Sequence, residues 1–343
     1  MPLTEELLAW YDAHKRRLPW RDEPTPYRVL LSELMLQQTR VDTVIPYFER
    51  FLARWPTLHD LANADPDEIL EQWAGLGYYR RARSLHAVAK AAVEAGGLSG
   101  DVQELRALPG IGPYTAGAIA SIAFGTCTPL VDGNVERVLC RLYDMADDPR
   151  KAAGRRAVWG RAEALVPADR PGDFNQALME LGATICKPRS PLCDVCPLSA
   201  RCAGQYRAER LPNKPPRKPP VPIEGVAGLI PWGDSVLLAR RPAGLLGGMW
   251  EPPGLWPLEG DLAGAVALEG AFLHRLGLHV RSTGSLGTVV HVFSHRRLSM
   301  QVFRLELVAA GEPAPISYYT SVGTQLKTGQ ALSRLSRKVL ALR

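Results

Sequence analysis

The sequence predicts a two-domain protein in which an all-α domain precedes an α+β domain. Its 343 residues exceed the roughly 100–200 that one domain commonly takes. Apolar residues recur at helical spacings through residues 1–206, whereas GVAGLIPWGDSVLLARR and TVVHVFSHRRLSMQVFRLELV have the pattern of strands separated by turns. Between these parts, LPNKPPRKPPVP at 211–222 has six prolines in twelve residues and predicts a semi-rigid basic linker. The predicted boundaries are 1–207, 208–224 and 225–343.

The charge is distributed unevenly between the two parts. The whole chain has a formal net charge of +6, but residues 1–210 carry 26 basic and 27 acidic side chains, while the rest carries 15 and 8. The basic total is therefore no evidence that the first part binds nucleic acid, and that interpretation must rest on local motifs. The basic second part suits a polyanionic partner such as DNA. With 46% hydrophobic residues, a wholly disordered chain is excluded.

No targeting or membrane segment is predicted. The N-terminus begins acidic and amphipathic rather than basic and then apolar. The longest uncharged stretch, 107–131, has 25 residues, but prolines and glycines interrupt it and leave only Tyr114–Phe124 as one apolar helix. A buried core helix is therefore favoured over a membrane span. We expect a cytoplasmic protein.

Four of the six cysteines fall within 17 residues at the spacing C-x6-C-x2-C-x5-C. They are Cys186, Cys193, Cys196 and Cys202. In an intracellular chain such a group predicts a metal site rather than disulfides. Four thiolates hold either structural zinc or an iron–sulfur cluster; the single CxxC favours iron–sulfur but leaves zinc open. Cys127 and Cys140 lie in apolar helical context and are expected to be small core residues.

LPGIGPYTA at 108–116 predicts a turn between two short helices. Gly110 and Gly112 allow a tight turn and close approach of the backbone to a ligand. Amides at the start of the second helix would then face an anion, such as a DNA phosphate. A glycine turn between helices is common by itself, so this signal is modest on its own.

Glu33 lies in YRVLLSELMLQQT, residues 27–39. On a helix its neighbours three and four positions away include Val29, Leu30 and Leu36, so its face is apolar. Burial raises the pKa of a carboxyl, and a carboxyl protonated near neutral pH can act as a general acid. The alternative is a glutamate at the edge of an exposed helix face.

Asp132 lies in TPLVDGNVERVL, where a short apolar run gives way to a helix. A plain helix N-cap by Asp132 or Asn134 would explain an aspartate here. The functional interpretation is a carboxylate kept ionised by the helix amides, which could stabilise a cationic transition state. One protonated and one ionised carboxyl is the arrangement of glycosidic chemistry.

These motifs together resemble the helix–hairpin–helix DNA glycosylases of the endonuclease III superfamily. SELMLQQT at 32–39, GLGYYRRAR at 75–83 and the additional C-terminal domain make the chain similar to the MutY-type adenine DNA glycosylases. The resemblance implies an all-α helix–hairpin–helix glycosylase domain with a [4Fe–4S] cluster on the four cysteines, followed by an α+β Nudix-like domain. It implies, as partner, double-stranded DNA with adenine opposite 8-oxoguanine or guanine, bound by a monomer that would associate with the nucleoid through this DNA.

The resemblance also implies roles for individual residues. Glu33 would protonate adenine N7 and then activate water, and Asp132 would stabilise the oxocarbenium-like sugar through its charge or a transient covalent adduct. Tyr114 would line the pocket, and Asn134 would order water or substrate. Bifunctional relatives carry a lysine at the position of Tyr114, so a Schiff-base lyase is not expected.

A further set of residues would contact the substrate base or the DNA. Trp20 and Arg21 would wall the adenine pocket, Gln38 and Thr39 would fill the space left in the duplex, and Tyr78 would wedge beside the oxidised guanine. The remaining members of this set are Leu36, Leu76, Gly110, Gly112, Phe293, Ser294 and His295.

LLGGMWEPPGLWPLEGD at 245–261 resembles the lead-in to a Nudix domain. Where Nudix hydrolases carry three carboxylates for magnesium, residues 270–277 read GAFLHRLG and have none, so diphosphate hydrolysis is not expected. In the resembled family this domain recognises 8-oxoguanine through a Phe-Ser-His loop, here Phe293-Ser294-His295. A polar hairpin tip without such a role is the alternative.

Two other functions remain open on the sequence. Some relatives with tyrosine at the hairpin position act on thymine opposite guanine, which makes a T:G mismatch glycosylase the second hypothesis. The third is a non-catalytic mismatch sensor that binds DNA without releasing a base.

Overall fold

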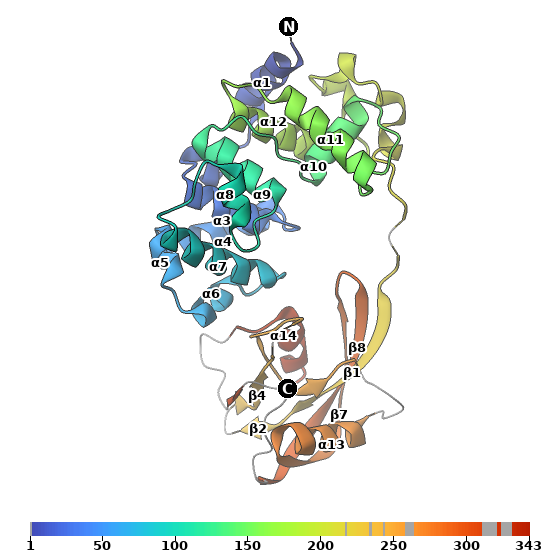
Figure 1. Cartoon of the computed structure of the whole chain (residues 1–343). Helices are drawn as coiled ribbons and strands as arrows, with labels where there is room; N and C mark the ends of the chain where they lie inside the picture. The colour runs from blue at the N-terminus through green and yellow to red at the C-terminus, as the bar shows by residue number, and fades with distance from the viewer. Residues whose placement is uncertain are drawn as a thin grey trace. The chain divides into compact units, whose positions relative to one another are not determined.

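The computed structural model describes residues 2–216, 218–232, 235–242, 244–257, 264–310, 321–323 and 331–343. The chain forms two compact units (Figure 1). Unit 1 contains Met1–Ala64 and Arg80–Pro216, and unit 2 contains Asp65–Tyr79 and Arg217–Arg343. The helical segment 65–79 therefore groups with the C-terminal part, although the predicted boundaries place it in the first domain. Within unit 2, Asp67 forms an ion pair with Arg240, and Arg334 donates to the Gly75 carbonyl over 2.9 Å.

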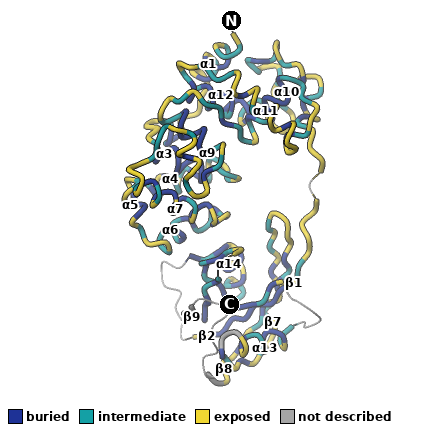
Figure 2. The backbone as a smooth tube through the Cα atoms, viewed as in Figure 1, coloured by how far each residue is buried: buried dark blue, intermediate teal, exposed yellow. Residues whose placement is uncertain are grey.

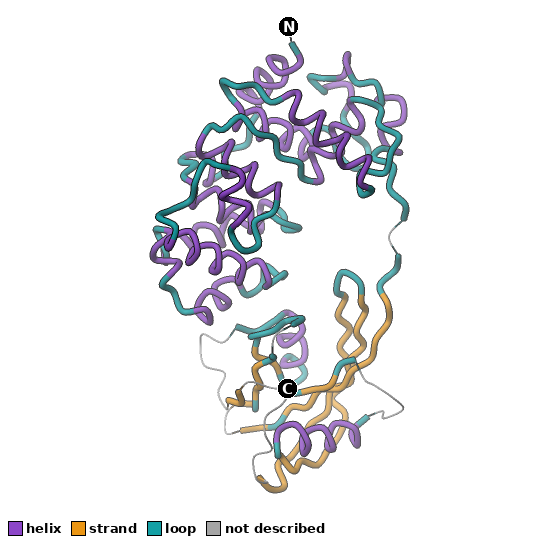
Figure 3. Tube along the Cα trace, viewed as in Figure 1, coloured by secondary structure: helices purple, strands orange, loops and turns teal. Residues whose placement is uncertain are grey.

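Unit 1 is built from helices (Figure 3). Its α-helices are α1 Leu3–His14, α2 Pro19–Asp22, α3 Pro26–Leu36, α4 Val41–Arg54, α5 Leu58–Ala62, α7 Arg80–Glu94, α8 Val102–Ala107, α9 Pro113–Ala118, α10 Gly133–Leu142, α11 Ala152–Leu165 and α12 Pro171–Thr184. A π-helix, Ile119–Ala123, continues α9, and three short 3-10 helices, Cys193–Val195, Ser199–Arg201 and Gln205–Arg210, follow α12.

Helix α3 is the central element of the site. It begins with Pro26 in its first turn, where a missing N–H costs nothing, and the Thr25 hydroxyl accepts from the Arg28 amide over 3.4 Å. Eight of its eleven residues are buried (Figure 2) because it packs against α4, α7 and α9. A second core joins α1, α10, α11 and α12 through side chains such as Leu7, Val138 and Phe174. Buried packing of this kind fixes the helix positions more firmly than helix propensity does.

The uncharged stretch 107–131 is not one helix. It passes through a turn after α8, then α9 and the π-helix, and then extended chain. Within the part of the chain that the structure describes, no helix is long and apolar enough to span a membrane. Cys140 is buried as expected, but Cys127 is exposed, because it lies in the extended chain beyond the π-helix rather than in a helix.

The turn between α8 and α9 uses its two glycines differently. Gly110 has φ +83°, in the left-handed region, and a Cβ there would lie 3.0 Å from Ser84 Oγ. Any other residue would be strained at this position. Gly112 has φ −93°, and a Cβ there would meet nothing within 4 Å. The turn therefore requires glycine at 110, whereas Gly112 leaves open space at the start of α9.

Unit 2 contains a mixed four-stranded sheet with the order β6-β1-β8-β7. Its strands are β1 Val221–Leu229, β6 Gly254–Leu255, β7 Leu278–Val292 and β8 Arg296–Ala310, and only β1 and β8 run parallel. The other strands form a β2–β3 hairpin, Pro231–Trp232 and Ser235–Val236, and a β5-β4-β9 sheet, Trp250–Glu251, Leu238–Arg240 and Ser321–Gly323. The remaining helices are α6 Pro66–Trp73, α13 Ala265–Leu276 and α14 Arg334–Leu340.

Helices cover both faces of the four-stranded sheet. Neighbouring residues of β1 point to opposite faces: Val226 packs with Phe272 of α13, and Ala227 shares a core with Val339 of α14. Helix α13 carries a single acidic residue, Glu269, which accepts from the Ser282 amide over 2.6 Å. No element could be assigned to residues 313–330 from the sequence pattern, and most of this segment lies outside the described residues.

Candidate active site

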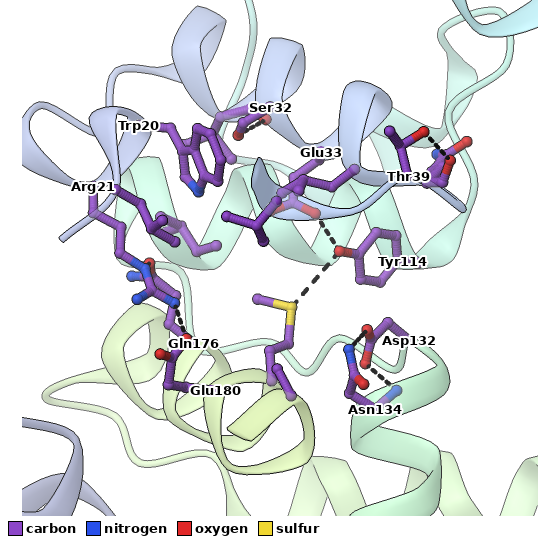
Figure 4. A pocket seen from close by; sticks show the side chains of 18 of the residues that line it. Trp20, Arg21, Ser32, Glu33, Thr39, Tyr114, Asp132, Asn134, Gln176 and Glu180 are labelled. Atoms are coloured by element: carbon purple, nitrogen blue, oxygen red, sulfur yellow. Dashed lines mark hydrogen bonds and ion pairs between the residues drawn. The ribbon is translucent and has the colours of Figure 1, made fainter. Parts of the chain in front are cut away.

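A cavity of about 470 Å³ opens between α3, α9, α10 and α12 of unit 1 (Figure 4). Nine of the predicted site residues line it: Trp20, Arg21, Glu33, Leu36, Gln38, Thr39, Tyr114, Asp132 and Asn134. The predicted hairpin glycines lie outside the lining, and Leu76, Tyr78 and the Phe293-Ser294-His295 loop belong to unit 2. The structure thus brings together residues predicted for the adenine pocket and for the duplex, from segments up to 114 positions apart.

Glu33 is buried in the cavity wall, with 4% of its surface exposed. Tyr114 Oη donates a hydrogen bond to its Oε2, and Met179 Sδ lies 3.7 Å from the same hydroxyl. Burial raises the pKa of Glu33 to about 7, although the Tyr114 hydrogen bond and the charge of Arg21 oppose the shift. A carboxyl with this pKa exchanges its proton near neutral pH, as general acid catalysis requires.

Asp132 is the N-cap of α10, which confirms the prediction of a helix cap at this position. Its Oδ1 accepts from the amides of Asn134 at 2.9 Å and Val135 at 2.7 Å, and its Oδ2 accepts from Asn134 Nδ2 at 2.8 Å. It also lines the cavity, so the capping and functional interpretations hold together. Burial raises the pKa of Asp132, while these three hydrogen bonds and Arg137 oppose it. The amides donate to the carboxylate as expected. Burial nevertheless has the larger effect, so the pKa of Asp132 is raised rather than lowered.

The side of the cavity that α12 forms was not predicted from the sequence. Gln176, Met179, Glu180 and Ala183 follow one another at helical spacing along one face of α12. Gln176 Oε1 accepts from Arg21 Nε over 3.2 Å. A pattern of mixed polar and apolar residues on a helix gives no sequence signal of a pocket. Only the fold brings α12 against Arg21, 155 positions earlier.

Glu180 fixes the position of Arg21 in this wall. It is 1% exposed and accepts from Arg21 Nη2 at 2.9 Å and from Arg16 Nε at 2.6 Å. Although burial opposes it, these two arginines hold the pKa of Glu180 below its ordinary value. The cavity therefore contains an ionised glutamate held by arginines as well as Glu33, whose pKa is raised.

Arg81 organises the turn that follows α3. Gln38 has φ +58°, a left-handed conformation that is uncommon for a residue other than glycine. The Arg81 guanidinium is buried and donates to the carbonyls of Leu34, Met35 and Gln37 at 2.9, 2.7 and 2.5 Å, and to Thr39 Oγ1 at 3.0 Å. One cation thus satisfies the last carbonyls of α3 and holds the turn that lines the cavity.

We expect Arg81→Met to lower the free energy of unfolding by about 1.5–3 kcal/mol, because it leaves carbonyls at the end of α3 without their charged donor. The DNA binding that is predicted from the sequence should also weaken, since the Gln38 turn is no longer held. Urea denaturation and a binding titration measure both effects. The matched control is Arg80→Met, which removes an exposed arginine one position earlier. Equal stability of the two variants would contradict this role.

Unit 2 brings together the residues predicted for the opposite base. Tyr78 is exposed and has φ +50°, and its Oη lies 3.4 Å from Ser294 Oγ. Ser294 lies in the turn between β7 and β8, which the Phe293 amide closes by donating to the Arg296 carbonyl over 2.8 Å. Leu76 is buried and does not present its side chain at the surface. Tyr78 and Ser294 are thus neighbours although they lie 216 positions apart in the sequence.

The four cysteines of the predicted cluster surround one small apolar cavity of about 30 Å³. Among the described residues, however, no three His, Cys, Asp or Glu side chains are grouped as around one metal ion. Four thiolates around one cavity are a ligand set that an iron–sulfur cluster accepts, so the residues present fit a [4Fe–4S] cluster.

Helix α10 connects the cysteine loop with the cavity. Arg141 is 1% exposed and donates from Nη1 to Cys186 Sγ over 3.3 Å and to the Lys187 carbonyl over 2.7 Å. Arg137 donates to the Cys186 carbonyl over 2.8 Å and to Asn134 Oδ1 over 2.9 Å. Two buried arginines of α10, three and seven positions after Asn134, thus hold the cysteine loop in place.

Comparison with known proteins agrees with this geometry. Residues 31–163 match the model of the HhH-GPD superfamily base excision DNA repair proteins, residues 186–202 the iron–sulfur binding domain of endonuclease III, and residues 226–342 the NUDIX domain. The adenine DNA glycosylase of Rattus norvegicus is 40% identical over 88% of this chain and 70% of its own length. The chain belongs to the adenine DNA glycosylase family. The human member is also 40% identical, and the chain covers 66% of its length.

Family membership settles several predictions. As a glycosylase the chain is a hydrolase of N-glycosyl bonds that acts on DNA, and removal of adenine in base-excision repair is the reaction of its family. The iron–sulfur match confirms the [4Fe–4S] cofactor over zinc. The Schizosaccharomyces pombe member, 33% identical, extends the relation over 80% of its own length.

Solved structures confirm the helical fold. A thermostable thymine-DNA glycosylase superposes with a TM-score of 0.54 at 29% identity, over 59% of this chain and 94% of that chain. Endonuclease III in a trapped covalent intermediate with DNA superposes with a TM-score of 0.50 at 25% identity, over 59% of this chain and 92% of that one. The helical fold is thus shared with a glycosylase that is named for thymine, so the fold alone does not set the base preference.

Proposed function

We propose that the protein hydrolyses the N-glycosidic bond of adenine mispaired with 8-oxoguanine, or with guanine, in duplex DNA, acting as a monomer and without lyase activity. The observation that carries the proposal is Glu33. A buried carboxyl with a pKa of about 7 lines a cavity of about 470 Å³, a volume in the range of sites that enclose small ligands. A flipped adenine enters this cavity from the duplex.

Glu33 delivers the proton that makes adenine a leaving group. Tyr114 donates to Glu33 Oε2, so the carboxyl proton is carried by Oε1. Transfer of that proton to adenine N7 gives a neutral base when the bond to the sugar breaks. The carboxylate that remains accepts a proton from the attacking water, and adenine and an abasic site are released. Trp20 and Arg21 line the same cavity and border the base.

Asp132 stabilises the positive charge that develops on the sugar. Three hydrogen bonds fix its carboxylate before the reaction, so no reorganisation is needed as the charge appears. Asn134 both holds Asp132 and lines the cavity. Tyr114 occupies the place where an amine would be required for a Schiff base, and burial raises its pKa well above the ordinary value. It therefore stays a neutral phenol, which supports a monofunctional reaction.

In this proposal, unit 2 recognises the base that lies opposite adenine. Ser294 hydrogen-bonds the oxidised base, Tyr78 wedges beside it, and their proximity of 3.4 Å supports a shared task. Gln38 and Thr39 fill the space that the flipped adenine leaves, and the Gly110–Gly112 turn contacts the backbone. Although the second part of the chain matches the NUDIX domain, we propose no diphosphate hydrolysis for it. Helix α13 has only one acidic residue, Glu269.

The decisive experiment uses end-labelled duplexes with A opposite 8-oxoguanine, A opposite G, T opposite G and a matched A–T pair. Each product is run with and without hot alkali. We expect cleavage of the adenine strand only after alkali, and no product from T opposite G. Nicking without alkali would disprove the monofunctional assignment. Release of thymine alone would instead favour the T:G glycosylase, and tight binding without any base release would favour a mismatch sensor.

A further inference from the structure

Phe293 at the β7–β8 turn is the end of a stacked column of side chains. Its ring stacks on Trp256 with centroids 5.6 Å apart and planes inclined by 11°. His291 meets the same ring edge-on at 4.6 Å. One face of Phe293 is therefore covered by an aromatic ring that is itself only 6% exposed. Offset stacking at this distance fixes the plane of the outer ring.

The far end of the column is a buried ion pair. The Arg241 guanidinium lies 4.1 Å from the centroid of the Trp256 ring, and its Nη1 donates to Glu251 Oε1 over 2.7 Å. Arg241 is 8% exposed and Glu251 4%. A cation held over an indole face is attracted by the ring, more strongly away from water. Because the pair is fixed by β5 and the end of β4, Trp256 has a rigid support.

The backbone of β1 makes room for this arrangement. A Cβ on Gly225 would lie 2.7 Å from the Trp256 Cβ, closer than real side chains approach. Glycine at 225 therefore lets Trp256 lie directly against the central strand. None of these residues lines the adenine cavity, and Trp256 contacts the β7–β8 turn through Phe293.

We infer that Trp256, supported by the Arg241–Glu251 ion pair, is a positioning residue that sets the plane of Phe293 and thereby determines the preference for 8-oxoguanine over guanine opposite adenine. The inference rests on the proposed function, in which the Phe293-Ser294-His295 turn reads that base. 8-Oxoguanine and guanine differ by few atoms, so discrimination between them requires a turn of fixed geometry. The rigid column supplies this geometry from within unit 2.

The test compares the affinity for A:8-oxoguanine and A:G duplexes, and the rate of adenine release under saturating enzyme. Trp256→Leu should lower the ratio of the two affinities by about two- to tenfold, the range for loss of one aromatic pair. The rate of release from A:G at saturation should not change. Trp256→Phe, which retains a stacking ring, should restore most of the ratio. Trp232→Leu, an exposed tryptophan on β2, is the matched control.

A second pair of variants covers the case in which Trp256→Leu does not fold. Arg241→Met/Glu251→Gln removes both charges together, so neither is left buried alone, and Gly225→Ala displaces the Trp256 ring without removing it. Both should lower the ratio as Trp256→Leu does. The inference is overturned if Phe293→Leu lowers the ratio while these variants do not. If the unaltered protein binds both duplexes equally well, or if Phe293→Leu leaves the ratio unchanged, the proposed recognition of the opposite base is rejected instead.

Discussion

Glu33→Gln is expected to slow adenine release by about 10²- to 10⁴-fold, the usual contribution of a positioned general acid or base. Glutamine retains the oxygen that accepts from Tyr114, so the wall of the cavity keeps its shape, but it has no proton to give to the base. Affinity for A:8-oxoguanine DNA should stay close to that of the unaltered protein. Single-turnover kinetics at saturating enzyme separate these two effects. Glu49→Gln, which removes an exposed carboxylate from α4, should change neither.

The same residue predicts the pH dependence of the reaction. Since the pKa of Glu33 is raised to about 7, the acid form is lost as the pH rises through that value, and the rate should fall with it. The sign for stability is the same. The folded pKa exceeds the ordinary value of 4.5, so the stability due to this protonated carboxyl is fully present below that value and is lost as the pH rises through about 7.

Glu33→Gln should therefore be at least as stable as the unaltered protein at pH 8, because it cannot ionise in the buried site. Thermal unfolding at pH 6 and pH 8 measures the difference. A variant that is inactive and also unstable at pH 8 would mean that Glu33 has a structural role rather than the catalytic one.

Local patterns were sufficient to predict the elements on which this site depends. The apolar face around Glu33 indicated its burial, and the glycines of the hairpin indicated a turn, because both follow from the geometry of one helix or one bend. The spacing of the four cysteines indicated a metal loop for the same reason. Each of these signals is contained within fewer than 20 residues.

Long-range contacts account for what the sequence did not reveal. Glu180 looks like an ordinary helix residue until the fold places Arg16 and Arg21 against it. Arg81 supports a turn 42 to 47 positions earlier, and no local pattern assigns it such a role. Asp132 was expected to stay ionised because of the helix amides, but the extent of its burial, which raises its pKa, depends on the packing around the cavity.

Asp132→Asn should lower the rate of adenine release by about 10²- to 10³-fold, the range for loss of one preorganised electrostatic group. Asparagine caps helices as well as aspartate does, so the Asn134 and Val135 amides retain an acceptor and α10 should keep its stability. Asp132→Ala should lose the rate and also about 0.5–2 kcal/mol of stability, because the cap is removed as well. Comparing the two variants by kinetics and urea denaturation separates charge from capping.

Asp101 provides the matched control, because it caps α8 with nearly the same geometry. It accepts from the amides of Gln103 at 2.7 Å and Glu104 at 3.0 Å, but it lies outside the cavity. Asp101→Asn should therefore leave the rate unchanged. The charge of Asp132 also helps to raise the pKa of Glu33, so Asp132→Asn should move the decline in rate to lower pH, whereas Asp101→Asn should not. If both variants slowed the reaction equally, the effect would belong to helix capping, and Asp132 would have no electrostatic role at the sugar.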